Sequence, residues 1–298
     1  MDNLDYIIDL FADADTVVRK AVDQFFETNG DEALSQLAVR YRGELDTERQ
    51  HLLQQMLTRY CRKNALEGLR QIALRSGQGQ ECNLLEGTWH IEQLLGINIS
   101  REAYWELVMP IAVQVMAETS PLKTAVENVH ILNHIFYQRC GFKPTEPFDI
   151  QLTTTRISDV VRNRKGNPFV LSILYFMIAQ SAGLPIYPMS FTGGFVPVYV
   201  EDGEVLFNIN VFHEGEIFFE KNITSTLNSQ IRAMGIEIDL EAGAVAKDHT
   251  ILVMYLEYLE MMFMGSGDTS MQSLMEDAIA ALGKQRHLSV EQDDDQDW

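Results

Sequence analysis

The stretch NPFVLSILYFMIAQSAGLP, residues 167–185, decides the fold of this chain. Asn167 is a good helix N-cap, Pro168 suits the first helical position, and Gly183 is a typical C-terminal stop. Between these signals the sequence is apolar on nearly every side of the helix rather than on one face. Because a helix of that composition must be covered all round, we expect it to lie at the centre of the fold.

Strands are expected to follow this helix, beginning with PIYPMSF at residues 185–191. The segment TGGFVPVYVEDGEVLFNINVF, residues 192–212, predicts a β-hairpin, because two apolar runs flank the turn pair Asp202-Gly203. A further short strand is expected in GEIFFE, residues 215–220. The hairpin itself carries no side chain that could attack a bond or transfer a proton near neutral pH.

Helices dominate the rest of the chain, since apolar residues recur at helical spacing. Ser120 is expected to cap one of them, with Pro121 at its first position. The expected helices lie at residues 16–28, 48–77, 83–95, 100–118, 120–141, 155–166, 248–265 and 268–287. This order predicts an α+β fold rather than a doubly wound one. We divide the chain into an N-terminal helical block (1–77), a core (78–221), a C-terminal helical segment (222–290) and an acidic tail (291–298).

The net charge of −20 excludes some partners. Neutralising phosphates requires clustered Lys and Arg, so we expect no nucleic acid and no anionic membrane surface as partner. The three cysteines, Cys61, Cys82 and Cys140, are widely spaced, which fits a reducing cytosol and no disulfide framework. The acidic N-terminus does not read as a signal peptide, and the longest apolar run, residues 169–179, is about half a bilayer span. We therefore expect a cytoplasmic protein.

Several segments resemble the bacterial SirB-type branch of the transglutaminase-like proteins, which share the papain-like core. They lie between about Leu84 and Phe218 and read NLLEGTWHIEQLL, ILNHIFYQRCGF, ISDVVRNRKGNPFVLSILYFMIAQSAGLPIY, FTGGFVPVYV and NINVFHEGEIF. The resemblance implies a papain/transglutaminase-like core with one buried helix and a small antiparallel sheet. That expectation agrees with the α+β order of elements.

The resemblance also implies where chemistry would lie. Active relatives use a Cys at the start of the buried helix, a His on the next strand and an Asp on the strand after. The helix N-terminus lowers the pKa of the thiol, the His transfers the proton, and the carboxylate orients the His. The matching positions here are Pro168, Gly194 and Asn210, so all three roles are vacant. The resemblance therefore implies a pseudoenzyme without the Cys-His-Asp triad.

Nearby residues are weak substitutes for the missing groups. Ser172 lies about one turn into the buried helix, where a core side chain is expected. Cys140 ends the preceding helical block, and a free cysteine there is more often a small buried hydrophobe than a nucleophile. His213, three residues after Asn210, is expected to be an exposed loop residue.

Two clusters of polar side chains are interpreted as surface features of helices rather than as binding sites. Glu127, His130 and His134 share one helix face at the spacing of a partial metal site, but no fourth ligand is evident. We interpret them as a polar face and expect neither a metal nor a cofactor. Arg162 and the pair Arg164-Lys165 end the helix expected at residues 155–166, where compensation of the helix dipole is favoured over an anion site.

Two hypotheses of function remain. The favoured one is a non-catalytic binding, scaffold or regulatory module that keeps the degenerate cleft as a groove for a protein or peptide partner. The groove would comprise Asn167, Phe169, Gly193, Gly194, Phe195, Asn210 and His213. The glycine pair would let a bound backbone approach closely, and first-turn amides of the helix would receive an acceptor. The alternative is a hydrolase or amide-bond-processing enzyme with a relocated nucleophile or a metal.

Overall fold

The computed structural model describes residues 3–13, 15–80, 82–146, 151–191, 194–219, 244–245 and 248–283. At its centre lies helix α9, Pro168–Ser181, in which every residue from Val170 to Ala179 is buried. The Asn167 side chain accepts the Phe169 N–H at 2.9 Å, and Gly183 follows the helix with a φ of +78°. The central helix expected from its capping residues is confirmed.

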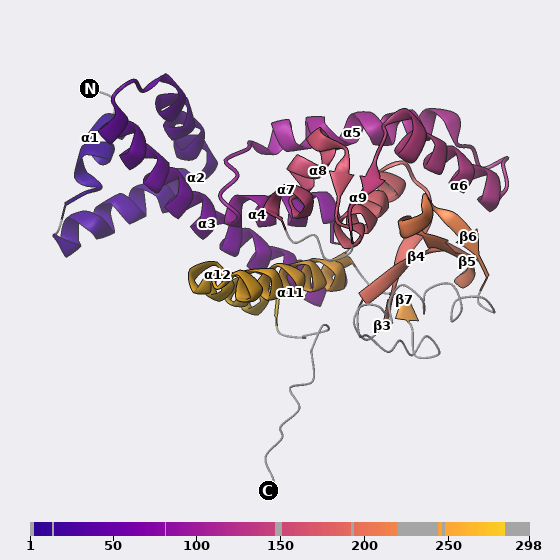
Figure 1. Cartoon of the computed structure of the whole chain (residues 1–298). Coiled ribbons are helices and arrows are strands. Elements are labelled where there is room, and N and C mark those ends of the chain that lie inside the picture. The colour runs from indigo at the N-terminus through magenta and orange to yellow at the C-terminus, as the bar shows by residue number, and fades with distance from the viewer. Residues whose placement is uncertain are drawn as a thin grey trace, which may run out of the picture.

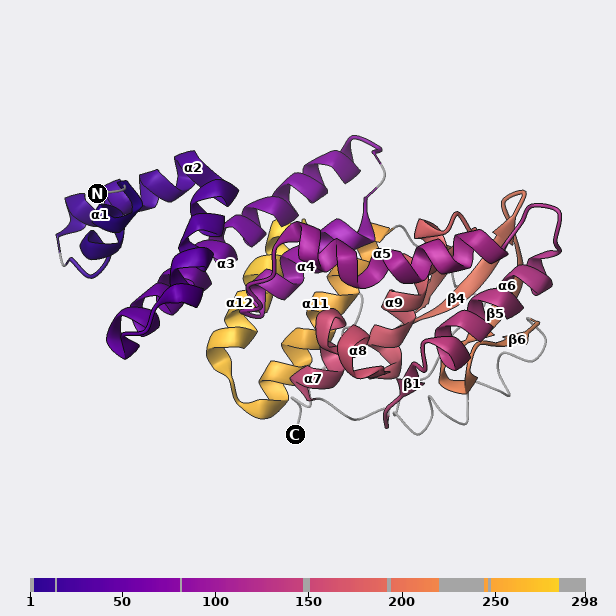
Figure 2. The ribbon, with the colours of Figure 1, turned by 90° about the horizontal axis from the view of Figure 1, so that it is seen from above.

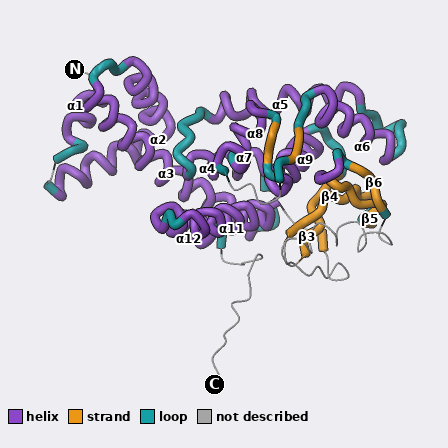
Figure 3. The backbone as a smooth tube through the Cα atoms, viewed as in Figure 1, coloured by secondary structure: helices purple, strands orange, loops and turns teal. Residues whose placement is uncertain are grey.

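An antiparallel sheet packs beside α9, with its strands in the order β6-β5-β4-β3-β7 (Figures 1 and 3). Its strands are β3 (Ile186–Phe191), β4 (Gly194–Glu201), β5 (Glu204–Asn210), β6 (Glu216–Phe218) and β7 (Ala244–Val245). Asp202 and Gly203 join β4 to β5 with φ values of +51° and +81°, the two positive values that a type I′ turn requires. The predicted hairpin and its turn are confirmed, whereas β7 was not expected.

Helices make up most of the remaining described chain, and the α+β fold is confirmed. Before the sheet lie α1 (Asn3–Leu10), α2 (Thr16–Gly43), α3 (Thr47–Gly77), α4 (Leu84–Leu94), α5 (Arg101–Glu118), α6 (Ala125–Asn133), the π-helix η1 (His134–Arg139), α7 (Leu152–Thr155) and α8 (Ile157–Asn163). Later come the 3₁₀ turn η2 (Val211–His213), α11 (Asp248–Ser266) and α12 (Thr269–Ala281). The helix expected at residues 16–28 continues to Gly43 as α2, which is kinked at Gly30, with φ +44° and ψ −126°. Across the described ranges, no helix combines the length and apolarity needed to cross a membrane.

Buried apolar side chains form two clusters that meet within α3. The smaller cluster lies among α1, α2 and the part of α3 up to Cys61, and the larger begins at Ala65 and includes α9. The N-terminal helices therefore extend as an arm from the main body (Figures 1 and 2). Between the clusters, Arg62 Nε donates to the Leu94 carbonyl at 3.0 Å, and Arg62 Nη2 lies 3.2 Å from the Met271 sulfur. Arg62 thus ties α3 to the end of α4 and to α12.

The helix expected to begin at Ser120 instead begins at Ala125, so that predicted boundary is wrong. Thr124 is the N-cap, and it forms a reciprocal capping box with Glu127. The Thr124 hydroxyl accepts the Glu127 N–H at 3.2 Å, and the Glu127 carboxylate accepts the Thr124 N–H at 2.8 Å. Two satisfied backbone donors outweigh the weaker preference of Ser and Pro for a helix start.

The helix expected to extend to residue 166 ends earlier, at Asn163 of α8. Arg164 then takes a left-handed conformation with φ +59°, and the chain enters a short strand. This strand, β2 (Lys165–Gly166), pairs in parallel with β1 (Lys143–Pro144). Only Arg162 lies in the last turn of α8, so dipole compensation does not account for Arg164 and Lys165.

A buried carboxylate fixes α8 just ahead of α9. Glu92 of α4 is fully buried and accepts the Ser158 N–H at 3.2 Å and the Ser158 hydroxyl at 2.5 Å. Burial raises the pKa of Glu92, and the hydrogen bonds from Ser158 partly oppose that rise. On the other side, the Tyr255 hydroxyl of α11 donates to the Thr155 carbonyl at 2.5 Å. The segment that precedes α9 is therefore held by both α4 and α11.

Candidate functional site

The three positions that the resemblance assigns to chemistry lie on three different elements. Pro168 begins α9, Gly194 begins β4 and Asn210 ends β5. Val198 pairs with Asn208 across the β4–β5 ladder, so Gly194 and Asn210 lie toward the same end of the hairpin. The helix start, one strand and the next strand thus occur in the order that the resemblance implies.

Aromatic rings fill the space at the start of α9. The Phe169 ring centroid lies 4.7 Å from that of Phe195 on β4 and 4.9 Å from that of Tyr258 on α11, whose plane is inclined by 18°. The Phe195 ring centroid also lies 5.3 Å from that of Phe176, which is about two turns after Phe169 on the same face of α9. Phe169 and Tyr258 are stacked, whereas Phe195 is tilted against both Phe169 and Phe176, and such contacts stabilise the packing. Phe169, Phe195 and Tyr258 each remain partly exposed. Helix α11 therefore covers the start of α9, which no local signal in the sequence indicated.

The polar residues at the start of α9 are used by the helix itself. Asn167 is 2% exposed, and its N–H donates to the Thr154 carbonyl at 2.7 Å. Ser172 is 5% exposed, and its hydroxyl donates to the Pro168 carbonyl at 2.9 Å. A serine bonded to the carbonyl four residues earlier is a common arrangement within a helix. The interpretation of Ser172 as a core side chain agrees with this geometry.

Asn210 and His213 form a hydrogen-bonded pair where β5 ends. Asn210 Oδ1 accepts the Phe212 N–H at 3.0 Å, which turns its Nδ2 toward His213 Nδ1 at 2.9 Å. An amide nitrogen donates hydrogen bonds, so in this contact the ring nitrogen Nδ1 is the acceptor. His213 is exposed, as expected. Asn210 is buried and holds the imidazole by an amide, where an active relative has a carboxylate.

Asn133 on α6 connects α9 to the turn that follows η2. Its Nδ2 donates to the Gly215 carbonyl at 2.7 Å, and its Oδ1 accepts the Tyr175 hydroxyl at 2.7 Å. Gly215 has a φ of +77°, and a Cβ there would lie 2.0 Å from Asn133 Oδ1. Sequence reasoning did not single out Asn133, although the motif ILNHIF contains it. The network fixes the end of the hairpin against the buried helix.

Contacts link the predicted groove residues in two pairs, at the helix start and at the end of β5. Phe169 and Phe195 are in contact beside Asn167 at the helix start. Asn210 and His213 are paired at the end of β5. Gly194 begins β4, whereas Gly193 lies outside the described residues.

None of the three cysteines is in an environment that activates a thiol. Burial raises the pKa of Cys61 to about 12, and burial near Asp248 raises the pKa of Cys82 to about 12. Burial also raises the pKa of Cys140, although Arg164 and Arg139 act in the opposite direction. Nucleophilic cysteines have lowered pKa values because the thiolate is the reactive form. All three thiols therefore stay protonated at neutral pH.

The candidate metal residues on α6 and η1 have other local roles. The Glu127 carboxylate closes the capping box of α6, and His134 Nδ1 lies 2.9 Å from Gln138 Oε1. His130 is exposed on the last turn of α6. Within the part of the chain that the structure describes, no group of three or more His, Cys, Asp or Glu side chains is arranged to hold a metal ion.

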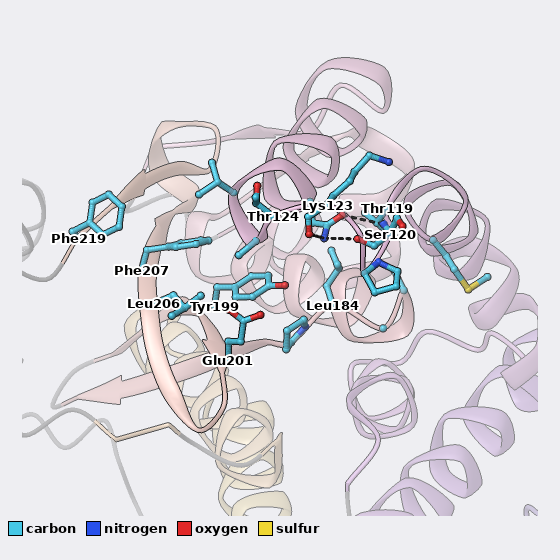
Figure 4. Close-up of a pocket in the computed structure, with 18 residues that line it drawn as sticks. Thr119, Ser120, Lys123, Thr124, Leu184, Tyr199, Glu201, Leu206, Phe207 and Phe219 are labelled. Atoms are coloured by element: carbon cyan, nitrogen blue, oxygen red, sulfur yellow. Dashed lines mark hydrogen bonds between the residues drawn. The ribbon is translucent and has the colours of Figure 1, made fainter.

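A surface cavity of about 800 Å³ lies near the C-terminal end of α9, and we name it the hairpin cavity (Figure 4). It opens between the α5–α6 corner and the β4–β5 hairpin, and the turn at residues 183–185 closes a third side. Tyr199 and Phe207 form an aromatic floor, with ring centroids 5.3 Å apart. Leu206 and Phe219, 38% and 58% exposed, form an apolar rim. The volume is in the range of ordinary ligand and peptide pockets.

The charged side chains of the hairpin cavity lie at its edges. Lys123 lines the side formed by the α5–α6 corner, and its Nζ donates to the Glu118 carbonyl at 2.9 Å. Glu201 lines the opposite side, at the end of β4. None of the predicted groove residues that the structure describes lines this cavity, and sequence reasoning did not predict it.

Comparison with known proteins gives one family and one relative. The family model of the transglutaminase-like superfamily matches residues 102–257, from the start of α5 to α11. The chain is 30% identical over 79 residues to the UPF0162 protein PM0557 of Pasteurella multocida (strain Pm70), a match that covers 26% of this chain and 30% of that protein. No solved structure matches. Since the family model covers just over half of the chain and includes α9 and the hairpin, the protein belongs to the transglutaminase-like superfamily.

Proposed function

We propose that the protein is a non-catalytic, SirB-type member of the superfamily that binds a protein or peptide partner. The observation that carries the proposal is the filled start of α9, where Phe169 packs between Phe195 and Tyr258. Space that an acyl substrate would need beside a nucleophile is occupied by side chains of the chain itself. These partly buried rings pack against the hydrophobic core and leave little room for a substrate beside the helix start.

The residues at the three assigned positions cannot perform the chemistry. Pro168 has no nucleophilic atom, and its ring also removes one N–H from the helix start. Gly194 has no side chain to transfer a proton. Asn210 has no negative charge, so it cannot stabilise an imidazolium as a carboxylate would. His213 is exposed, and Asn210 contacts its ring through an amide rather than a carboxylate.

Three observations weigh against the enzyme alternative. The thiols of Cys61, Cys82 and Cys140 have raised pKa values. The Ser172 hydroxyl is buried and donates to a backbone carbonyl. Glu127 is committed to a capping box rather than facing a ligand. A relocated nucleophile or metal therefore has little support from the described side chains.

The hairpin cavity is the surface that best suits a partner. It combines a buried aromatic floor, an exposed apolar rim and single charges at its edges, which is how peptide-binding surfaces are composed. We therefore place the partner there rather than over the degenerate cleft, because α11 covers the helix start. The preferred partner is a peptide segment that inserts an apolar side chain between Leu206 and the aromatic floor. The net charge of −20 argues against a nucleic-acid partner. The three free thiols favour a cytoplasmic location.

Adjacent residues on β5 provide a matched test of this surface. Leu206 and Val205 are neighbours on β5 and are 38% and 40% exposed. Only Leu206 lines the cavity. We expect Leu206→Arg, which places a charge beside the aromatic floor, to reduce capture of the partner about tenfold or more, and Val205→Arg to leave it unchanged.

The measurement is an affinity capture from lysate of the source cell, quantified by mass spectrometry, with wild type, both β5 variants and Gly194→Arg. Equal thermal unfolding of the four proteins would be checked first. Loss of the partner with Gly194→Arg, together with full capture by Leu206→Arg, would move the site back to the degenerate cleft. Equal capture by all four proteins would exclude both surfaces.

A further inference from the structure

The short β1–β2 ladder gathers positive charge in an otherwise acidic protein. Lys143 and Lys165 are Cα partners in this parallel ladder, and both side chains are exposed. Arg164 precedes Lys165, and Arg162 is exposed on the last turn of α8. We name these four residues the basic ladder. Lys143 lies about 20 residues before the other three, so the sequence alone groups only Arg162, Arg164 and Lys165.

The basic ladder carries several locally unfavourable features. Two like charges stand side by side on paired strands, which disfavours the pairing. Arg164 has a left-handed backbone conformation with φ +59°, which is energetically unfavourable for residues other than glycine. Its Nη1 is buried without a hydrogen-bond partner among the described residues, while its guanidinium carbon lies 4.8 Å from the centroid of the Phe142 ring. The strained backbone and the unpaired Nη1 belong to the same residue, Arg164, and such a combination is found at ligand-binding sites.

The charges of the basic ladder are not neutralised within the described chain. No ion pair forms to Lys143, Lys165 or Arg164 from the residues that the structure describes. Arg162 Nη1 lies 3.6 Å from Asp159, and the same carboxylate also accepts from Arg156 Nε at 2.6 Å. Glu146, which is exposed two residues after β1, is the nearest other acid on this segment. The group therefore keeps a net positive charge.

We infer that the basic ladder binds an acidic peptide segment, one with several Asp or Glu side chains in sequence. The exposed ammonium groups of Lys143 and Lys165 stand side by side on paired strands, where they can donate to neighbouring carboxylates of one segment. The stacking of Arg164 on Phe142 holds its guanidinium in place without using its donors. A single enclosed phosphate fits less well, because Lys143, Arg162 and Lys165 are exposed. This inference is independent of the hairpin cavity.

The test uses the full chain and a fluorescein-labelled hexa-aspartate peptide, with binding followed by anisotropy at about 50 mM salt. The variant Lys143→Gln/Lys165→Gln is compared with Lys20→Gln/Lys63→Gln, which removes the same charge from exposed positions on α2 and α3. We expect the ladder variant to weaken binding about tenfold or more and the control variant to weaken it less than twofold. Arg164→Gln should weaken binding as well, while Arg164→Lys restores part of it.

Three outcomes would overturn the inference. The first is no binding of hexa-aspartate by wild type. The second is equal weakening by the ladder and control variants, which would mean a general charge effect. The third is tighter binding of a hexathymidylate than of hexa-aspartate at the same salt concentration, which would indicate a nucleic-acid surface. A folded ladder variant, checked by circular dichroism, makes each result interpretable.

Discussion

Replacing Gly215 by alanine is expected to lower the free energy of unfolding by about 3 to 5 kcal/mol. The residue has a φ of +77°, and a Cβ would lie 2.0 Å from Asn133 Oδ1. Relieving that clash displaces Asn133, which then loses its bonds to the Gly215 carbonyl and the Tyr175 hydroxyl, both 2.7 Å long. Left-handed strain contributes about 1 to 2 kcal/mol, and the two buried hydrogen bonds contribute the rest.

Gly203→Ala is the matched control for this variant. Gly203 has a φ of +81°, but no atom lies within 4 Å of the position a Cβ would take. Its loss should be limited to backbone strain, about 1 to 2 kcal/mol. Urea denaturation of both variants measures the difference. Equal losses would mean that Asn133 does not hold the hairpin against α9.

Replacing Phe169 by alanine is expected to cost about 2 to 4 kcal/mol of folding free energy, because its ring packs between two others. A ring that lined an open active site would be worth much less. The interaction with Tyr258 is isolated by a double-mutant cycle with Tyr258→Ala, for which a coupling of about 1 kcal/mol is expected. The cycle is measured by chemical denaturation of the two single variants and the double variant.

Tyr187→Ala serves as the reference for loss of an aromatic side chain near the surface. Tyr187 is 39% exposed on β3 and should cost about 1 kcal/mol or less. If Phe169→Ala were no more destabilising than Tyr187→Ala, and showed no coupling to Tyr258, the start of α9 would be an open site. The proposal of a filled cleft would then fail.

The central parts of the fold could be predicted because their signals are local. Asn167, Pro168 and Gly183 mark both ends of α9 within one stretch of sequence. The turn pair Asp202-Gly203 sets the hairpin, since both residues accept positive φ. Where two local signals competed, as at the start of α6, the reciprocal capping box prevailed over a serine followed by proline.

The candidate sites could not be predicted in the same way, because they depend on contacts between distant segments. Tyr258 reaches Phe169 from almost ninety residues further along the chain. Lys143 meets Lys165 through a ladder of two residues per strand, too short to leave a pattern in the sequence. The hairpin cavity exists only where the α5–α6 corner faces the sheet. The sequence shows which residues occupy the three vacant positions. It does not show that aromatic rings from distant segments pack at the start of α9.

The most direct test of the central claim, that this chain has lost the chemistry of its superfamily, is the pH dependence of thiol alkylation. Native protein is treated with iodoacetamide at a series of pH values, and each cysteine is quantified by peptide mass spectrometry. Because burial raises the pKa of Cys61, Cys82 and Cys140, each rate should be slow at pH 7 and still rising at pH 9. A cysteine that reacts rapidly at pH 7, with a rate that levels off below pH 8, would reveal a thiolate nucleophile and contradict the account.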